Sequence, residues 1–402
     1  MSLIAGSLGV GKTSAINHLL MKMLDWLIIG AGVHGLHAAA RLRRRGSTLR
    51  LLDPHPHPLA EWERRAEVLA MGHLRSPLDQ DIDVGELSLH HFAEAQPRLE
   101  PGSFAGPCRA PSVALFRRHV EWVRGRLDLD ALLERGLARS VELVEGGVRV
   151  ESDRGSLTAR RLIVAIGRPR THVPAWAKAI GGPTLHVYDP EFDRSPPSGS
   201  VVVVGGGLSA AQLALRWAQL RPGATTLICR RPPLIAELDA APRWAGPRWS
   251  WRFANFPLAG RVAMLDSELR RGSVPPRVAA RLARAQRRGS LRVVFGEVTH
   301  TQREAAGLAL SINGDPALRC DRLALATGFA RGFEGVPLFD LTAQALGLAR
   351  GPRATPLLDA ALRWHPRIHV IGAAACLSLG PLAANIAGAR LASARLEVLA
   401  LP

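Results

Sequence analysis

The chain has few cysteines, and it has no apolar run long enough to span a membrane. Its cysteines lie far apart, with neither a CxxC pair nor the spacing of a metal site, which predicts free thiols, a reducing cytoplasm and no bound metal ion. No basic segment followed by an apolar core and a cleavage site marks a secretory signal. The four cysteines are Cys108, Cys229, Cys320 and Cys376.

Lysine is also scarce, so arginine carries nearly all of the positive charge behind the formal net value of +18. The arginines are spread along expected helices and are not interleaved with aromatic residues as in proteins that bind single-stranded nucleic acid. We therefore expect a solvated basic surface that attracts anionic small molecules, and no nucleic-acid partner. The length of 402 residues allows two or three domains.

The first informative motif is a glycine fingerprint directly after the apolar run 26–29. Its glycines are Gly30, Gly32 and Gly35, and helical spacing continues to a stop at Gly46. A second strand then ends in Asp53, at about the 20-residue interval expected for the acid that binds ribose hydroxyls. This complete context predicts a dinucleotide site with its pyrophosphate at the helix N-terminus.

A variant of the same fingerprint follows the apolar run 201–204. It has Gly205, Gly207 and, in the third position, Ala210, where a small residue suffices. The next strand ends in Arg230 and Arg231 instead of an acid. Guanidinium groups attract a 2′-phosphate, so the pair favours NADPH over NADH. The alternative is that the two arginines merely reflect the arginine-rich composition.

The N-terminal residues 6–13 match the phosphate-binding loop GxxxxGK[ST] and, with residues 17–20, resemble the opening of the metal-chaperone GTPases. The next strand begins near Asp25, which leaves no room for the rest of such a domain. We expect residues 1–22 to be a remnant or a wrongly assigned start, with Met21 or Met23 as the initiator.

Three later segments read as strands that return to the two sheets and end in small residues. The first runs from Arg160 to Gly167, the second is 321–329, and the third, 369–373, precedes a final helix expected over 381–399. The small residues expected against a flavin are Gly167 and Gly372, and those expected against NADPH are Ala326, Thr327 and Gly328.

With these motifs the chain resembles the flavin-dependent lysine and ornithine N-hydroxylating monooxygenases and the FAD/NAD(P)-binding proteins related to them. The resemblance is carried by the two fingerprints, by the Leu-Arg-Ser-Pro turn at 74–77, and by 321–329, which is close to D-x3-L-A-T-G-Y with Phe329 for tyrosine. It spans residue 24 to the end and implies FAD in the first site, NADPH in the second, and a C4a-hydroperoxyflavin that hydroxylates a small nucleophile. It also suggests Arg75 as a catalytic candidate that contacts the flavin or steadies the peroxide side.

Other flavoenzymes of this architecture are distinguished by their own motifs. Disulfide reductases need a redox cysteine pair, which this chain lacks. Monooxygenases that oxidise sulfur and ketones carry F-x-G-x3-H, to which Ile180-x-Gly182-x3-His186 is a degenerate match. His186 is therefore a second catalytic candidate, and a linker that merely contains one histidine is the alternative.

The predicted fold is α/β, with two Rossmann-like domains and the NADPH domain inserted into a discontinuous FAD domain. The FAD domain takes residues 24–170 and 318–402, a hinge takes 171–199, and the NADPH domain takes 200–317. Within the insert, residues 240–276 are expected to form an irregular excursion over the active-site cleft or a packed surface flap.

Three functions remain open from the sequence. The first is an NADPH-dependent FAD monooxygenase that acts on a small amine or sulfur metabolite with oxygen. The second is a flavoprotein reductase or dehydrogenase that passes electrons to a quinone or another acceptor. The third is a GTP-binding metal-handling protein led by the N-terminal loop. Substrate identity and oligomeric state are not determined by these patterns.

Overall fold

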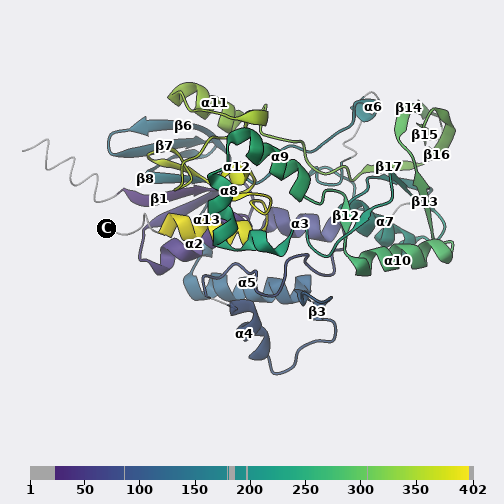
Figure 1. Ribbon diagram of the computed structural model, residues 1–402, viewed down its shortest axis with the longest axis horizontal. Coiled ribbons are helices and arrows are strands. Elements are labelled where there is room, and N and C mark those ends of the chain that lie inside the picture. The colour runs from purple at the N-terminus through teal and green to yellow at the C-terminus, as the bar shows by residue number, and fades with distance from the viewer. Residues whose placement is uncertain are drawn as a thin grey trace, which may run out of the picture.

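The computed structural model describes residues 23–85, 87–178, 180, 186–195, 198–305 and 307–397. The phosphate-loop match of residues 1–22 lies outside these residues, as does Gly182 of the degenerate motif. Two lobes lie side by side along the long axis of the molecule (Figure 1), and each is built around its own parallel sheet.

The first lobe contains an eight-stranded sheet with the order β18-β19-β8-β1-β2-β5, to which β6 and β7 are added through β8. The central strand β1 is parallel to both β2 and β8, as expected for a strand that feeds a crossover helix. The strands are β1 (Leu24–Ile29), β2 (Leu49–Asp53), β5 (Leu133–Arg135), β6 (Ala138–Val144), β7 (Gly147–Ser152), β8 (Gly155–Val164), β18 (Arg363–His365) and β19 (Ile368–Val370).

Successive side chains of β1 point to opposite faces of this sheet, and each face is covered by a different layer. Trp26 and Ile28 point to a core shared with helices, whereas Leu27 and Ile29 point to a core on the opposite face. The first face is covered by α2 (Val33–Arg44), α5 (Val113–Leu127) and α13 (Ile386–Glu397), and the second by β6, β7 and α11 (Pro337–Leu346). The continuous apolar run after residue 25 is therefore a strand buried on both faces.

The second lobe repeats this plan on a smaller scale. Its parallel sheet has the order β13-β10-β9-β17, with helices on one face and an antiparallel meander on the other. On β9, Val201 and Val203 face the helices, while Val202 faces the meander. The elements are β9 (Val201–Val204), α7 (Leu208–Leu220), β10 (Thr225–Cys229), α10 (Pro276–Arg287), β13 (Leu291–Phe295), β14 (Val298–Glu304), β15 (Gly307–Ile312), β16 (Asp315–Cys320) and β17 (Arg322–Leu325).

The predicted return to the first domain at residue 318 needs correction. Strand β17 pairs in parallel with β9, so the chain stays in the second lobe to the end of that strand. It crosses back afterwards, and Phe333 is the first residue of this return that enters the core of the first lobe. The outward and return crossings lie side by side, because Thr171 forms an antiparallel bridge with Phe329.

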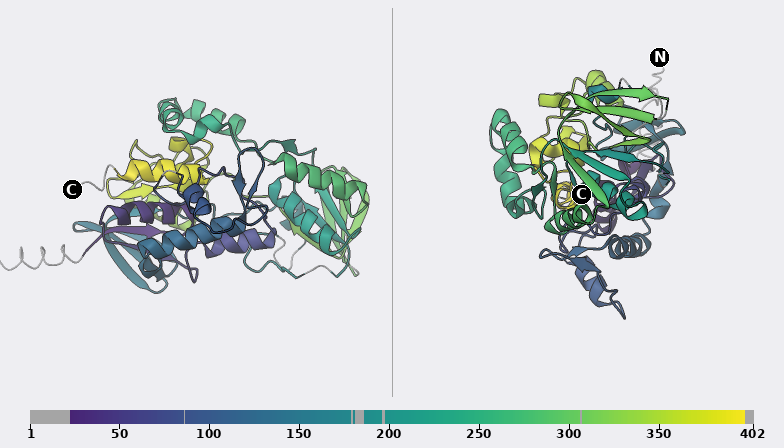
Figure 2. Two further views of the ribbon diagram at one scale, coloured as in Figure 1. Left: turned by 90° about the horizontal axis from the view of Figure 1, so that it is seen from below. Right: turned by 90° about the vertical axis from the view of Figure 1, so that its right-hand side faces the viewer.

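The excursion that the sequence placed within the insert packs its helices on the first lobe, whereas Val274 in its last strand belongs to the core of the second lobe. The excursion comprises β11 (Leu234–Ile235), η2 (Pro242–Ala245), α8 (Pro247–Ala254), α9 (Leu258–Glu268) and β12 (Ser273–Val274). Helices α8 and α9 pack on α12 (Cys376–Leu379), and Trp244 and Phe253 share a core with Leu377. Figure 2 shows this segment standing over the C-terminal part of the chain. A cap on the first lobe is thus supplied by the inserted sequence.

The remaining elements are short. Within the predicted hinge, α6 packs against β14, and Thr301 donates a hydrogen bond to the carbonyl of Trp176 at 2.9 Å. Among the described helices, none is long and apolar enough to cross a membrane. The short elements are α3 (Ala60–Val68), α4 (Ser88–Glu94), β3 (Phe104–Ala105), β4 (Ala110–Pro111), η1 (Asp130–Leu132), α6 (Ala175–Lys178), η3 (Pro352–Ala354) and η4 (Gly372–Ala375).

Several buried histidines make stability depend on pH. Burial lowers the pKa of His37 to about 3 and the pKa values of His34, His119, His186 and His369 to about 4. Between about pH 6.5 and 4 the unfolded chain binds protons that the folded chain excludes, so the free energy of unfolding falls as the pH falls through this window. Each histidine contributes a slope of up to about 1.4 kcal/mol per pH unit.

Urea unfolding at pH 7, 6 and 5 measures this dependence, and His37→Gln is expected to reduce the slope by about one proton. His91→Gln is the matched control, because this side chain is exposed in the folded protein. An unchanged slope for His37→Gln would contradict a buried neutral imidazole at this position.

Candidate functional site

The first glycine turn joins β1 to α2 by close backbone packing. Gly30 has φ 103°, and a Cβ there would lie 2.6 Å from the carbonyl oxygen of Ala165. A Cβ on Gly35 would lie 1.8 Å from the carbonyl oxygen of Gly30. Gly32 differs from both, because a Cβ there would meet nothing within 4 Å. Two glycines therefore close the turn, and the third leaves open space at the start of α2.

The N-terminus of α2 is suited to an anion. Gly32 is its N-cap and makes no side-chain capping bond, and the first turn holds no acidic residue. The free amides and the positive end of the helix dipole therefore face the open space beside Gly32. A dinucleotide pyrophosphate fits this cradle.

Asp53 lies at the end of β2, as the sequence predicts. Its carboxylate accepts hydrogen bonds from the amide of Ala31 at 2.7 Å and from Nδ1 of His55 at 2.7 Å. Burial alone would raise the pKa of Asp53, but the bonds from His55 and Ala31 outweigh it and lower the pKa below its ordinary value. The hydrogen bond to Asp53 in turn raises the pKa of His55. Asp53 is thus an ionised acceptor beside the turn, suited to ribose hydroxyls.

The C-terminal part of the chain closes over this turn through His34. Its Nε2 donates to the carbonyl of Ala383 at 2.9 Å, and its ring lies 3.4 Å from where a Cβ on Gly372 would stand. Burial lowers the pKa of His34 to about 4, so the ring is a neutral donor. Gly372, with φ 77°, opens η4, and Gly167, with φ 70°, follows β8. Both predicted flavin-side glycines therefore lie at the carboxyl edge of the first sheet, and His34 is a contact that the motif did not reveal.

The second glycine turn joins β9 to α7 in the same way, with a looser contact at its third position. A Cβ on Gly205 would lie 2.4 Å from the carbonyl oxygen of Ala326 and 3.0 Å from the Cβ of Ala210. Gly207 is the N-cap of α7 and has no side-chain capping bond. Alanine is accommodated at 210 because Gly205 leaves room for its methyl group.

The segment after β17 lies at the carboxyl edge of the second sheet. The amide of Ala326 bonds to the carbonyl of Val204, and the carbonyl of Gly328 accepts from the amide of His172 at 2.9 Å. The hydroxyl of Thr327 donates to the carbonyl of His172. The predicted Ala-Thr-Gly segment thus lies between the second glycine turn and the crossing between the lobes.

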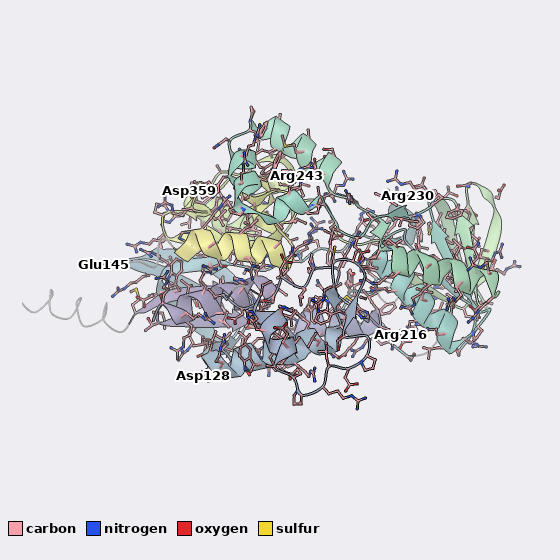
Figure 3. All side chains as sticks on the ribbon, turned by 60° about the horizontal axis from the view of Figure 1, so that its bottom comes forward. Asp128, Glu145, Arg216, Arg230, Arg243 and Asp359 are labelled. Carbon is pink, nitrogen blue, oxygen red and sulfur yellow. The ribbon has the colours of Figure 1, made fainter. Side chains whose placement is uncertain are left out.

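Arg230 and Arg231 follow β10 at this same edge and are exposed. Figure 3 shows Arg230 on the second lobe, whereas Arg243, farther along the same insert, lies beside α13 of the first lobe. The two arginines end the strand that pairs with β9, which is the position expected for groups that read the adenosine ribose.

Arg75 is held by the base of the excursion. Its guanidinium donates to the carbonyl of Ala236 at 2.7 Å, to the carboxylate of Asp239 at 2.5 Å and to the hydroxyl of Ser273 at 2.8 Å. Further bonds reach the carbonyls of Glu237 and Ser273. Through these bonds Arg75 connects the first lobe to the base of the excursion. Its contact with a flavin remains a prediction.

His186 is buried beside the second sheet. Its Nδ1 accepts the amide of Tyr188 at 3.2 Å, and burial lowers its pKa to about 4, so the ring is neutral. Tyr188 stacks on Phe329, with ring centroids 4.9 Å apart, and its hydroxyl bonds to Ser209 at the start of α7. The sequence identified His186 but missed Tyr188 as the residue that links this segment to the glycine turn.

A pocket of about 690 Å³, open mouth included, lies where the excursion covers the first lobe. One wall comes from Arg168 after β8 and from Ala373 and Ala383, which flank the first cofactor turn. Apolar side chains of α9 form another wall. The described residues hold no cluster of three or more histidine, cysteine or acidic side chains that could bind a metal ion.

Comparison with known proteins agrees with this arrangement. The pattern of the pyridine nucleotide-disulphide oxidoreductase family matches residues 24–393. An uncharacterized oxidoreductase, CzcO, of Bacillus velezensis is 22% identical over 229 residues, which cover 56% of this chain and 59% of that relative.

Two solved structures share the fold over nearly the whole chain. The ornithine N-hydroxylase of Kutzneria sp. 744 has a TM-score of 0.76 at 15% identity and covers 94% of this chain and 99% of its own. The cadaverine monooxygenase of desferrioxamine biosynthesis from Erwinia amylovora has a TM-score of 0.74 at 17% sequence identity. The match covers 94% of this chain and 95% of that protein's chain. The predicted α/β fold with two dinucleotide-binding lobes is therefore confirmed.

The two kinds of glycine in the first turn predict different mutant behaviour. Gly35→Ala is expected to lower the unfolding temperature and to abolish flavin retention, because its methyl group overlaps a backbone carbonyl. Gly32→Ala meets no protein atom, so it is expected to leave the unfolding temperature of the apoprotein nearly unchanged while it weakens flavin binding. Thermal unfolding and the flavin content after purification measure both effects. Equal destabilisation by the two variants would contradict this division of roles.

Proposed function

The chain belongs to the pyridine nucleotide-disulphide oxidoreductase family, and on that premise we propose that it is an NADPH-dependent FAD monooxygenase. The observation that carries the proposal is the pair of uncapped glycine turns, one at the carboxyl edge of each parallel sheet. Two turns of this kind in one chain fit a flavin and a nicotinamide dinucleotide. In the overall reaction NADPH supplies two electrons, one atom of O₂ enters the substrate, and the other leaves as water.

The protein's own residues bind and orient these groups. In the first lobe, the amides after Gly32 hold the pyrophosphate and Asp53 accepts from the ribose. In the second lobe, the amides after Gly207 hold the second pyrophosphate, and Arg230 and Arg231 pair with a 2′-phosphate. Bound reduced flavin supplies the activation of oxygen, and the protein positions the substrate and excludes water.

The cysteines do not support dithiol chemistry, although the family includes disulfide reductases by name. All four are free, and no two are close enough in sequence to form a CxxC pair. Burial raises the pKa of Cys229 to about 11 and of Cys320 to about 12, and it also raises the pKa of Cys108 and Cys376. Thiols with raised pKa values are poor nucleophiles, so electron transfer to a disulfide through these cysteines is disfavoured.

Spectroscopy of the purified protein tests the cofactors and the reaction together. Flavin absorbance is expected in the protein as isolated or after FAD is added, and NADPH is expected to bleach it without oxygen faster than NADH does. Oxygen is then expected to restore the oxidised spectrum. A colourless protein that takes up no FAD would refute the proposal. Reoxidation by a quinone but not by oxygen would identify a reductase instead.

The arginine pair predicts the choice of nicotinamide cofactor. Arg230→Gln combined with Arg231→Gln is expected to raise the KM for NADPH about tenfold or more and to leave the KM for NADH nearly unchanged, because only NADPH carries the 2′-phosphate. Stopped-flow flavin reduction at varied cofactor concentration measures both constants.

Arg292→Gln is the matched control, because this exposed arginine stands near the start of β13, at the opposite edge of the same sheet. A similar loss of NADPH affinity in the control would show that overall charge, and not the pair, sets the preference.

A further inference from the structure

We propose that the pocket beneath the excursion takes a substrate with a carboxylate and an uncharged apolar arm, and that Arg168 and Arg271 bind the carboxylate. This inference rests on the proposed monooxygenase function and names the class of substrate for it. It is carried by the charges and contacts of the residues that line the pocket.

Arg168 is a cation without a protein partner. It follows Gly167 at the carboxyl edge of the first sheet and is half-buried, yet within the described part of the chain no hydrogen bond or ion pair reaches its guanidinium. Burial lowers the pKa of Arg168, a sign that its charge is poorly solvated there. Since a partly buried charge without a partner is costly, an anion at this position would offset that cost.

Arg271 is the second cation of the pocket without a described side-chain partner. It lies between α9 and β12, on the excursion, and therefore approaches the pocket from the covering side. Desolvation lowers the pKa of Arg271, and repulsion from Arg168 and Arg331 lowers it further. Arg168 and Arg271 thus line the same pocket from different parts of the chain, and a carboxylate bound there would be attracted by both charges.

The other two arginines of the lining are engaged by a carboxylate outside it. Arg353 donates to both oxygens of Asp266 at 3.1 and 2.7 Å, and Arg331 lies 3.9 Å from the same group. Among the described residues that line the pocket, none is an aspartate or a glutamate. Asp239 attracts Arg168 and Asp266 attracts Arg271 from outside the lining, but no described hydrogen bond or ion pair joins either pair. Within the described lining itself, a cationic substrate would therefore meet arginines and no carboxylate.

The remaining lining residues indicate what the part of the ligand away from the carboxylate is like. Apolar side chains of the excursion and of α12 surround the space, together with small residues beside the first cofactor turn. They can bury an apolar arm but offer no acid to hold an ammonium group. A carboxylate whose arm carries a neutral nitrogen or sulfur fits these walls, whereas a diamine does not. The apolar and small lining residues include Val262, Leu265, Leu269, Phe333, Leu377 and Ala383.

A second hollow, between α4 and α5, offers a contrast. It also holds two arginines, Arg44 and Arg126, but both bind the buried carboxylate of Asp83, at 3.0 and 2.6 Å. Its positive charge is therefore already paired within the protein. Of these two hollows in the described part of the chain, the pocket beneath the excursion is the one that combines arginines without a described side-chain partner with residues that flank the first cofactor turn.

Binding of three probes of equal length tests the inference. The FAD-loaded protein is titrated, without NADPH, with hexanoate, hexanamide and hexylammonium, and calorimetry gives each dissociation constant. Hexanoate is expected to bind at least tenfold more tightly than either of the others. Equal affinities, or a preference for hexylammonium, would overturn the inference.

Variants then assign the binding to the two arginines. Arg168→Gln and Arg271→Gln are each expected to weaken hexanoate binding about tenfold or more and to leave hexanamide unchanged. Arg281→Gln, which removes an exposed charge on α10, is the matched control and is expected to change neither. Arg271 is exposed, so its variant keeps the test valid if Arg168→Gln does not fold.

Two further results separate this inference from the proposed function. If both variants weaken the binding of NADP⁺ and leave the binding of hexanoate unchanged, the two arginines bind the cofactor and the inference is wrong. If the protein holds FAD and is reduced by NADPH but shows no preference for hexanoate, the inference fails while the proposed function stands. A protein that binds no FAD fails the proposed function itself.

Discussion

The structure depends on close backbone contacts that are possible only because glycine has no side chain. Gly35 packs where a Cβ would stand 1.8 Å from the carbonyl oxygen of Gly30, and a Cβ on Gly30 would stand 2.6 Å from the carbonyl oxygen of Ala165. These contacts bring α2 against the ends of β1 and β8 and turn its free amides toward the edge of the sheet. The second lobe uses the same device with a looser contact at its third position, because Gly205 leaves room for the methyl group of Ala210. Each dinucleotide site therefore follows from packing of the main chain.

The two lobes are joined by more than the crossing chains. The excursion leaves the second lobe and packs on the first, and Asp239 near its base binds both Arg75 and Asn385. A pocket between the excursion and the first sheet is thus made of segments from three parts of the sequence. This arrangement places a covered cavity beside the first cofactor turn, where a reaction that must exclude water would require it.

The sequence shows how many arginines the chain has, but only the folded structure shows which of them are paired. Most arginines whose contacts are described pair with carboxylates or backbone carbonyls, as Arg64 does with Glu61 and the carbonyl of Tyr188. Arg168 and Arg271 are exceptions, and both face one pocket. Composition alone suggested a general attraction for anions, whereas the structure places two arginines without a described side-chain partner in the lining of one pocket.

The sequence by itself determined the parts whose geometry is local. The strand, the turn and the helix that follow Trp26 are neighbours along the chain, so glycine spacing was enough to predict the first site, and the same holds for Gly205 and for Asp53. The tertiary structure decided what depends on distant pairing. It assigned β17 to the second sheet, bound Arg75 to residues 236–273, and laid α9 over Arg168. Contacts between segments far apart in the chain leave no periodicity in the sequence, because they depend on how whole lobes pack.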